Sequence, residues 1–256
     1  MPTFFTFKIF QKFPHLKHLV TQKSSDFAYD FSLALHTQEA PKDILANRER
    51  LKAYFPQKTS YVLANQSHSA NIVFIEKQDK PISQGWDSQA SAIADCDALI
   101  TQQSNLALGI LTADCVPILL YDPVVQLIAV VHAGWKGTKA QILFKTIKQM
   151  QKEHGSNPKD ILAGIAPSIG KCCYEIHLDV AQYFLQDSQA YTQKGDKYML
   201  DLPYINQTQL LDAGLQKEHI ELSHICTSCQ NQNYFSYRKE QGCSGRFISM
   251  MALECK

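Results

Sequence analysis

The sequence predicts an α/β (α+β) fold, a single domain over residues 1–256 in which helices flank mixed β-sheets. A chain of 256 residues can form one large domain, and neither an internal repeat nor a Pro/Gly/Ser-rich linker divides it. Apolar runs rich in β-branched residues interleave with amphipathic helical patterns. Because the gaps between them have both hairpin and crossover lengths, mixed sheets are favoured over a uniformly parallel sheet.

Four segments have helical spacing. In the first, "PKDILANRERLKAYF", the apolar residues recur on one side of a helix. The second is strongly amphipathic and ends at Gly155, and the fourth ends at Gly214; glycine suits the end of a helix because it tolerates a left-handed backbone. Helices are therefore predicted over 41–55, 137–155, 178–187 and 200–215.

Strands are predicted from apolar runs bounded by turn residues. The segment "YVLANQSHSANIVFI" indicates two short strands around a polar turn, and "DALITQQSNLALGILTADCVPILLYD" indicates strand, turn, strand. A buried strand in "LIAVVHAGW" ends at His132, and "DILAGIAPSIG" predicts a strand followed by a turn. From Ser223 to Leu253 we expect a loop and one or two strands.

Composition excludes several classes of protein. Apolar residues make up 45% of the chain and charged residues 19%, as in a folded soluble domain. The net charge of +1 gives no electrostatic reason to expect a nucleic-acid or membrane partner. The N-terminal apolar stretch is interrupted by Lys8, Lys12 and Pro14 and lacks the order of a signal peptide. We therefore expect a cytoplasmic protein.

Eight cysteines are many for such a protein, and reduced thiols are the expected state. The pair in "CTSC", Cys226 and Cys229, has the spacing of a redox dithiol or of half a zinc site. A structural zinc site needs a second pair, and Cys243 with Cys255 has the wrong spacing. The spacing therefore predicts neither role for this pair.

Three reactive side chains lie at the ends of predicted strands: His68 in "NQSHSA", Cys115 in "TADCVP" and His132 in "VVHAGW". Two imidazoles and a thiolate suit zinc, and three protein ligands leave a fourth position for water or substrate, as in catalytic zinc sites. Spacing alone leaves two alternatives open. The cysteine and histidines could be core or hydrogen-bonded structural residues, or Cys115 could be a nucleophile with His132 as its base.

Two further motifs could contact a ligand. Aromatics alternate with Arg238, Lys239 and Arg246 in "YFSYRKEQGCSGRF", where rings could stack on a base while an arginine holds a phosphate; an edge strand with a solvated basic face is the alternative. In "HAGWKGT", Lys136 could pair with an anion, or the segment could be only a strand-to-helix turn.

Taken together, "TADCVPILLYDP", "VHAGWKGT", "IAPSIGKCCYEI" and "CTSCQNQNYFSYRKEQGCSGRF" closely resemble the YfiH family, also called laccase-domain or polyphenol oxidase proteins. The resemblance runs from about residue 47 to residue 250. It implies a Cys–His enzyme fold related to that of cytotoxic necrotizing factor. It also implies a zinc site whose ligands fall on His68, Cys115 and His132, with copper as the alternative metal.

The family resemblance also implies an activity. Members act as purine nucleoside phosphorylases, which split adenosine, inosine, guanosine and methylthioadenosine with phosphate, and they deaminate adenosine. Purine nucleosides and phosphate are therefore the expected partners. The sequence departs from the family near its start, where Gln22 replaces an expected arginine and "SLALH" replaces Asn-Leu-Gly-x-His. Lys136 stands where many members have arginine, which keeps the charge but loses the bidentate fork.

The sequence thus predicts a zinc-dependent purine nucleoside phosphorylase with adenosine deaminase activity. Arg48, Lys136 and Arg238 are candidates to hold phosphate, and Asp114 is a candidate to orient a ligand or shuttle a proton. Three alternatives remain: a copper-dependent polyphenol oxidase, a metal-free Cys–His hydrolase, and a non-enzymatic partner protein. The first is weakened because the chain has nine histidines and no His-x-His pair. The oligomeric state stays open.

Overall fold

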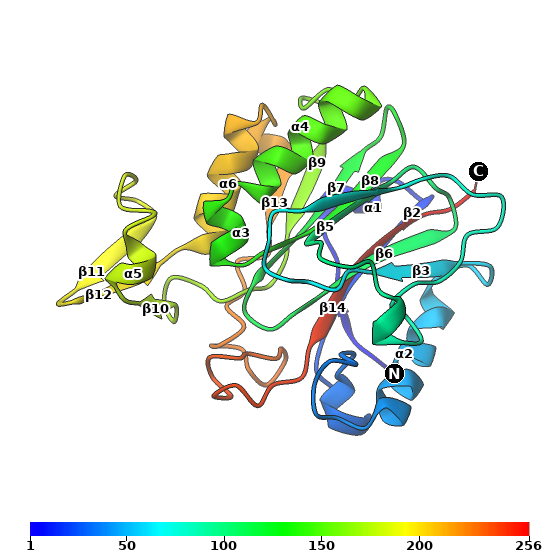
Figure 1. The fold of residues 1–256 in the computed structure, drawn as a ribbon, viewed down its shortest axis with the longest axis horizontal. Coiled ribbons are helices and arrows are strands. Elements are labelled where there is room, and N and C mark those ends of the chain that lie inside the picture. Colours follow the sequence, from blue (N-terminus) through cyan, green and yellow to red (C-terminus); the bar gives the residue numbers. More distant parts are fainter. Residues whose placement is uncertain (256) are drawn as a thin grey trace.

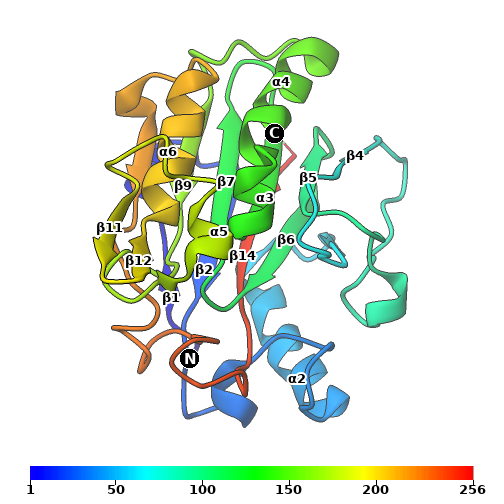
Figure 2. The same cartoon turned by 60° about the vertical axis from the view of Figure 1, so that its left-hand side comes forward.

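Two large β-sheets pack face to face, and helices cover their outer faces (Figures 1 and 2). This arrangement is seen in a computed structural model, which describes residues 1–255. A small three-stranded sheet projects from one side, at the left of Figure 1. Among the helices that the structure describes, none combines the length and apolar character that a bilayer crossing requires.

The elements within residues 1–255 are as follows. The α-helices are α1 (Lys8–Gln11), α2 (Pro41–Leu51), α3 (Trp135–Lys139), α4 (Ile142–His154), α5 (Leu178–Ala181) and α6 (Leu202–Asp212). The 3-10 helices are η1 (Ala28–Phe31), η2 (Lys52–Tyr54), η3 (Gln89–Ser91) and η4 (Lys217–His219). The strands are β1 (Phe4–Phe5), β2 (Leu16–Thr21), β3 (Ser60–Leu63), β4 (Ile72–Ile75), β5 (Ala98–Thr101), β6 (Leu106–Thr112), β7 (Val116–Asp122), β8 (Leu127–Ala133), β9 (Leu162–Ile165), β10 (Glu175–Ile176), β11 (Tyr191–Lys194), β12 (Lys197–Leu200), β13 (Ile220–Leu222) and β14 (Phe247–Leu253).

Both large sheets are mixed, as predicted. The five-stranded sheet has the order β1-β2-β14-β6-β3, and β3 is parallel to β6 whereas β14 is antiparallel to both of its neighbours. The six-stranded sheet has the order β13-β9-β7-β8-β5-β4, with parallel pairs at its two edges and antiparallel pairs within. The small sheet has the order β10-β12-β11.

Strand periodicity divides the buried residues among layers. Along β7, Leu119 and Tyr121 join the cluster between the two sheets, while Ile118 and Leu120 face the cluster beneath α4 and α6. Because successive side chains of a strand point to opposite faces, a strand buried on both faces reads as a continuous apolar run. A third cluster, which includes Leu51, covers the outer face of the five-stranded sheet next to α2.

The structure also corrects the predicted elements. Residues 97–122 contain three strands, β5, β6 and β7, where strand, turn, strand was predicted. The predicted helix 137–155 is two helices, because Gln141 has a left-handed backbone with φ of 59° and interrupts it. Helix α5 is shorter than predicted. The strands β1, β2, β10, β11, β12 and β13 were not predicted, since they are short or partly polar.

The N-terminal segment is packed into the fold and does not hang free. The Phe7 ring is fully buried, and a Cβ atom added at Gly164 on β9 would lie 2.8 Å from that ring. Only glycine therefore lets the segment approach this strand so closely. His18 on β2 accepts a hydrogen bond from the Phe7 backbone N–H at 2.8 Å, and burial lowers the pKa of this imidazole to about 4.

We expect Gly164→Ala to lower the free energy of unfolding by about 1–3 kcal/mol, because the added methyl group collides with the Phe7 ring. Urea denaturation measures the change. The matched control is Gly164→Ala in a Phe7→Ala background, where the ring is absent and the cost should be much smaller. An equal cost in both backgrounds would contradict this packing.

Candidate active site

Three reactive side chains meet at one end of the two sheets. His68 lies on the link from β3 to β4, and Cys115 on the link from β6 to β7; both links cross from the five-stranded to the six-stranded sheet. His132 is the penultimate residue of β8. Cys115 Sγ is 3.9 Å from His68 Nε2, and the two imidazole centroids are 4.8 Å apart. The three side chains predicted at strand ends therefore form one cluster.

Asp97, immediately before β5, holds the cluster in place. Its fully buried carboxylate accepts a hydrogen bond from His132 Nδ1 at 2.7 Å. It also accepts bonds from the backbone N–H groups of His68 and Ser69, at 3.1 and 2.7 Å, and from the Ser69 hydroxyl at 2.8 Å. One carboxylate thus orients both the His132 ring and the loop that presents His68, and it leaves His132 Nε2 for the cluster.

Sequence analysis did not identify Asp97. The only signal available was an aspartate directly before a buried strand, since a carboxylate in that position needs hydrogen-bond partners. Burial raises the pKa of this carboxyl, but the hydrogen bonds from His132 and Ser69 outweigh burial and lower it to about 2. Asp97 therefore stays ionised near neutral pH while it is hydrogen-bonded to His132.

The electrostatic environment favours a thiolate at Cys115. Burial raises the pKa of this thiol, but the attraction and hydrogen bonding of His132 and His68 lower it to about 6. Burial lowers the pKa of His132, whereas Cys115 and Asp97 raise it above its ordinary value. Thiolate is the form that binds a metal or attacks an electrophile. The pair of Cys115 and His132 is therefore suited either to bind a metal or to provide a nucleophilic cysteine with a basic partner.

Backbone geometry around the cluster is unusual for residues other than glycine. His68 has φ of 60° and Asp114 has φ of 91°. Non-glycine residues with such φ values are strained and concentrate at functional sites. At Gly134, directly after β8, an added Cβ would lie 3.0 Å from Cys115 Sγ and 3.1 Å from His68 Cδ2. The glycine lets the chain turn into α3 without displacing the two side chains.

Asp114 is held by both of its carboxylate oxygens. Oδ1 accepts a hydrogen bond from the Thr227 hydroxyl, and Oδ2 accepts one from the Arg238 backbone N–H, both at 2.7 Å. Its backbone carbonyl accepts a bond from the Ile169 N–H at 2.9 Å. These bonds tie the strained turn next to Cys115 to two distant segments of the chain. Asp114 thus fixes the position of Cys115.

The cluster opens into a cavity of about 640 Å³, a volume suited to a small organic ligand. The cavity is lined by polar, aromatic and basic side chains, among them His36, His68, Asp114, Cys115, His132, Trp135, Tyr174, Tyr237, Arg238 and Arg246. The cavity lining therefore combines rings that can stack with guanidinium groups that can bind an anion.

Of the three residues predicted to contact phosphate, the structure places only Arg238 in the cavity lining. Arg238 lines the cavity, and its guanidinium donates to the Glu175 carbonyl at 2.8 Å. Arg48 lies outside the lining: it is fully buried, and its guanidinium donates to the carbonyls of Leu33, Gly85 and Trp86. Arg48 therefore has a structural position in place of the predicted contact with phosphate.

Lys136 is exposed and also lies outside the lining, although the neighbouring Trp135 is part of it. Gln22, which stands where the family has arginine, donates to the Tyr234 hydroxyl at 2.9 Å and does not reach the cavity. His36, from "SLALH", and Arg246 do line it. Burial, together with Arg246, lowers the pKa of His36 to about 4, so this imidazole is neutral near pH 7.

The donor set fits a zinc ion. Tetrahedral zinc with sulfur at ~2.3 Å and nitrogen at ~2.0 Å places the two ligand atoms about 3.5 Å apart, close to the 3.9 Å between Cys115 Sγ and His68 Nε2. The ligand atoms of all three residues lie within 4.8 Å of one another. Asp97 accepts a hydrogen bond from His132 Nδ1, and histidines that bind metals typically donate their other ring N–H to a carboxylate in this way.

Comparisons with known proteins place the chain in a family. Residues 18–254 match the model of a family described as multi-copper polyphenol oxidoreductase laccase. The chain is 34% identical to the purine nucleoside phosphorylase YlmD of Bacillus subtilis over 226 residues, 86% of this chain and 81% of that protein. It is 32% identical to the adenosine deaminase RL5 of an unknown prokaryotic organism, with 72% of each chain covered.

A solved structure agrees with this placement. The crystal structure of the Bacillus licheniformis hypothetical protein YfiH superposes with a TM-score of 0.90 at 30% identity, covering 99% of this chain and 97% of that one. The sequence match and the shared fold thus extend over nearly all of the chain. The protein belongs to the YfiH family of laccase-like proteins, whose family model matches it from residue 18 to residue 254.

Proposed function

We propose that this protein is a zinc-dependent purine nucleoside phosphorylase that also deaminates adenosine, and that residues 1–256 form one catalytic domain. Adenosine, inosine, guanosine and methylthioadenosine are the proposed nucleosides. The observation that carries the proposal is the cluster of His68, Cys115 and His132 in a cavity that also contains aromatic rings and guanidinium groups. The names of the two relatives, a phosphorylase and a deaminase, support both reactions.

His68, Cys115 and His132 would hold the metal, and Asp97 would position His132 and the His68 loop. Zinc bound there would supply a Lewis acid and leave one coordination position for water or substrate. Asp97 keeps the proton of His132 on Nδ1, so that Nε2 is free to bind. The residues of the chain thus preset the geometry that the metal requires.

Phosphorolysis joins a phosphate oxygen to the anomeric carbon of ribose while the bond from that carbon to the purine nitrogen breaks, and the departing base takes a proton. Arg238 and Arg246, both in the cavity lining, are placed to bind the dianionic phosphate. Trp135, Tyr174 and Tyr237 offer rings on which the purine can stack. In deamination, water replaces the amino group of adenosine and ammonia leaves.

Asp114 acts in this proposal as a positioning residue. Its two carboxylate oxygens accept hydrogen bonds from the Thr227 hydroxyl and the Arg238 backbone N–H, which hold the carboxylate in one orientation. Its bond to the Arg238 backbone connects the turn that carries Cys115 with the segment that carries a proposed phosphate contact. Asp114 therefore couples the metal side of the cavity to the phosphate side.

Adenosine turnover with and without phosphate, on protein of measured metal content, tests the function. Zinc-loaded protein should release adenine only with phosphate and should form inosine, and chelation should abolish both activities. Cys115→Ala should lose the metal held with His68 and His132, together with activity, whereas Cys243→Ala, an exposed cysteine outside the cavity, should keep both. Activity that survives chelation would favour a metal-free Cys–His hydrolase, and phenol oxidation by copper-loaded protein alone would favour an oxidase.

Asp97→Asn should weaken zinc binding by about 10–100-fold, as expected when the partner of a histidine ligand is removed. Competition with a chromophoric chelator measures the affinity. Asp95→Asn is the matched control, because Asp95 lies two residues away, is exposed, and contacts Ser67 and Asn71 but not His132. If both variants bind zinc as the wild type does, Asp97 does not position the ligand.

Arg246→Gln and Arg238→Gln should each raise the KM for phosphate about tenfold or more, because a charge-assisted hydrogen bond contributes about 1.5–3 kcal/mol. The KM for nucleoside should change much less. Lys136→Gln tests the third predicted contact, and we expect a smaller effect because this side chain lies outside the lining. An unchanged KM for phosphate in both arginine variants would contradict the assignment of Arg238 and Arg246 as phosphate contacts.

A further inference from the structure

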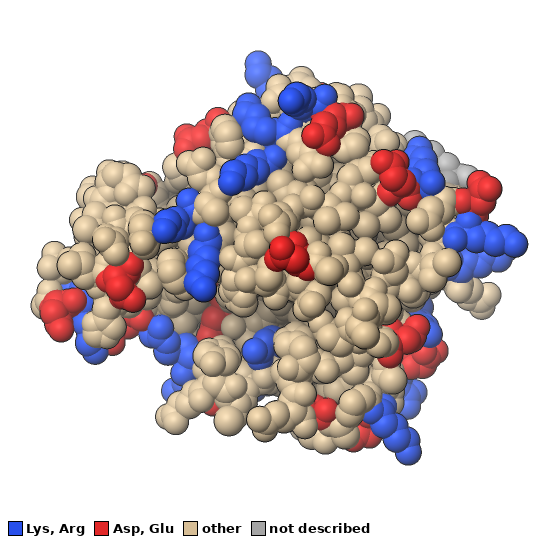
Figure 3. Space-filling view, in the orientation of Figure 1, with Lys and Arg blue, Asp and Glu red and all other residues tan. Residues whose placement is uncertain are grey.

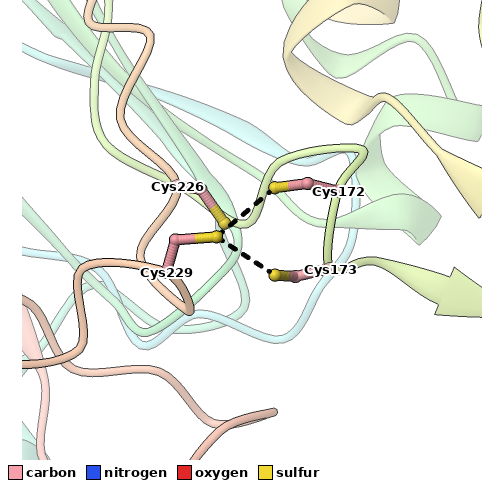
Figure 4. Close-up of side chains that lie close together, drawn as sticks. All are labelled: Cys172, Cys173, Cys226 and Cys229. Carbon is pink, nitrogen blue, oxygen red and sulfur yellow. Dashed lines mark hydrogen bonds between the residues drawn. The ribbon is translucent and has the colours of Figure 1, made fainter.

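Four cysteines from two distant segments converge outside the cavity. Cys172 and Cys173 lie on the loop between β9 and β10, and Cys226 and Cys229 lie on the segment after β13. Figure 4 shows the four side chains pointing toward one another from these two segments. Cys229 Sγ is 3.6 Å from Cys172 Sγ and 3.4 Å from Cys173 Sγ, and the four sulfurs lie within 4.8 Å of one another.

We propose that Cys172, Cys173, Cys226 and Cys229, here called the thiol cluster, bind a second zinc ion in a closed tetrahedral site. A zinc–sulfur bond of ~2.3 Å gives an edge of about 3.8 Å between sulfurs of a tetrahedron. The distances of 3.6 and 3.4 Å from Cys229 Sγ lie slightly below this value, and all four sulfurs lie within 4.8 Å of one another. Four sulfur ligands without nitrogen or oxygen select a thiophilic cation. Because no position is left for water, this zinc has a structural role.

The surroundings of the thiol cluster suit thiolate ligands. The Gly170 backbone N–H donates to Cys226 Sγ at 3.3 Å, a bond that stabilises sulfur in its charged form. A Cβ at Gly170 would lie 3.3 Å from Cys226 Cβ and 3.4 Å from Cys172 Sγ, so the two segments pass close to each other at this glycine. All eight cysteines of the chain are unpaired thiols. A cation would offset the repulsion among four thiolates.

The thiol cluster also has a consequence for the cavity. Around it, the Thr227 N–H donates to the Ser168 carbonyl at 3.0 Å, and the Thr227 hydroxyl and the Ile169 N–H both bind Asp114. Tyr174, which directly follows Cys173, lines the cavity. A metal that cross-links the two segments would therefore fix the wall of the cavity next to Cys115. This inference does not depend on which reaction the cavity performs.

The sequence analysis predicted no metal site at "CTSC" because it looked for a second pair of cysteines with the same C-x-x-C spacing. The second pair is adjacent cysteines 53 residues earlier, counted from Cys173 to Cys226, and not another C-x-x-C. Adjacent cysteines can both reach one ion here because they lie on a tight turn, in which the Cys173 and Tyr174 N–H groups both bond to the Gly170 carbonyl. Only the folded chain reveals the partnership.

Metal analysis of purified, reduced protein tests the proposal. Cys226→Ser and Cys172→Ser should each lose one zinc per chain, whereas Cys243→Ser, the matched exposed cysteine, should lose none. His68→Ala, which disrupts only the active-site cluster, should retain one tightly bound zinc. Cobalt substituted into His68→Ala should give the intense visible bands of a tetrahedral tetrathiolate. Equal zinc in the Cys226→Ser and Cys243→Ser variants, or iron in place of zinc, would overturn the assignment.

The reactivity of the thiols can be measured on the wild-type protein, so this test does not depend on whether a cysteine variant folds. Cys172 and Cys229 are exposed, so as simple thiols they should react with a disulfide reagent as fast as Cys243. Bound to zinc they should be protected, and chelation should release them together with the metal. Equal rates before chelation, or a mass showing two disulfides, would refute the proposal. The outcome is independent of nucleoside turnover, so failure of one proposal leaves the other testable.

Discussion

The Asp97 carboxylate is the interaction on which the proposed active site depends. Asp97 directly precedes β5, and it accepts hydrogen bonds from His132 on β8 and from the backbone of the loop that carries His68. A buried carboxylate is costly unless all of its oxygens are paired, so the loop and the strand are held in one relative position. The low pKa of Asp97 keeps the charge in place over the whole physiological range.

The layered fold places this carboxylate. Both large sheets bury apolar residues on both faces, and the two links that carry His68 and Cys115 cross between the sheets at the same end. A side chain on such a link reaches a residue of the other sheet without a long loop. Figure 3 shows acidic and basic side chains interspersed over the face in that view. With a net charge of +1 as well, the proposed binding of phosphate would depend on Arg238 and Arg246 in the cavity lining.

Two sulfur-containing sites would then stabilise the same region from opposite sides. The turn at Asp114 adjoins Cys115 on one side and is bonded to Thr227 and Ile169 on the other, next to the thiol cluster. The strained φ of 91° at Asp114 persists because those bonds over-determine it. In this arrangement a structural metal would act on the cavity wall through ordinary hydrogen bonds.

The sequence by itself determined the mixed α/β class, the buried strand that carries His132 near its end, the helices α2, α4 and α6, and the family. These features depend on periodicity and end residues within single segments, and on the order of motifs along the chain, all of which can be read without knowing tertiary contacts. It also singled out His68, Cys115 and His132, because each is a reactive residue at a strand end. Arg48 and Arg238 could not be told apart, since both are arginines in amphipathic surroundings; only packing makes one a buried structural donor and the other a cavity residue. The roles of Asp97 and of the adjacent cysteines likewise required tertiary structure, because a buried carboxylate or a four-sulfur cluster is defined by partners that lie tens of residues away.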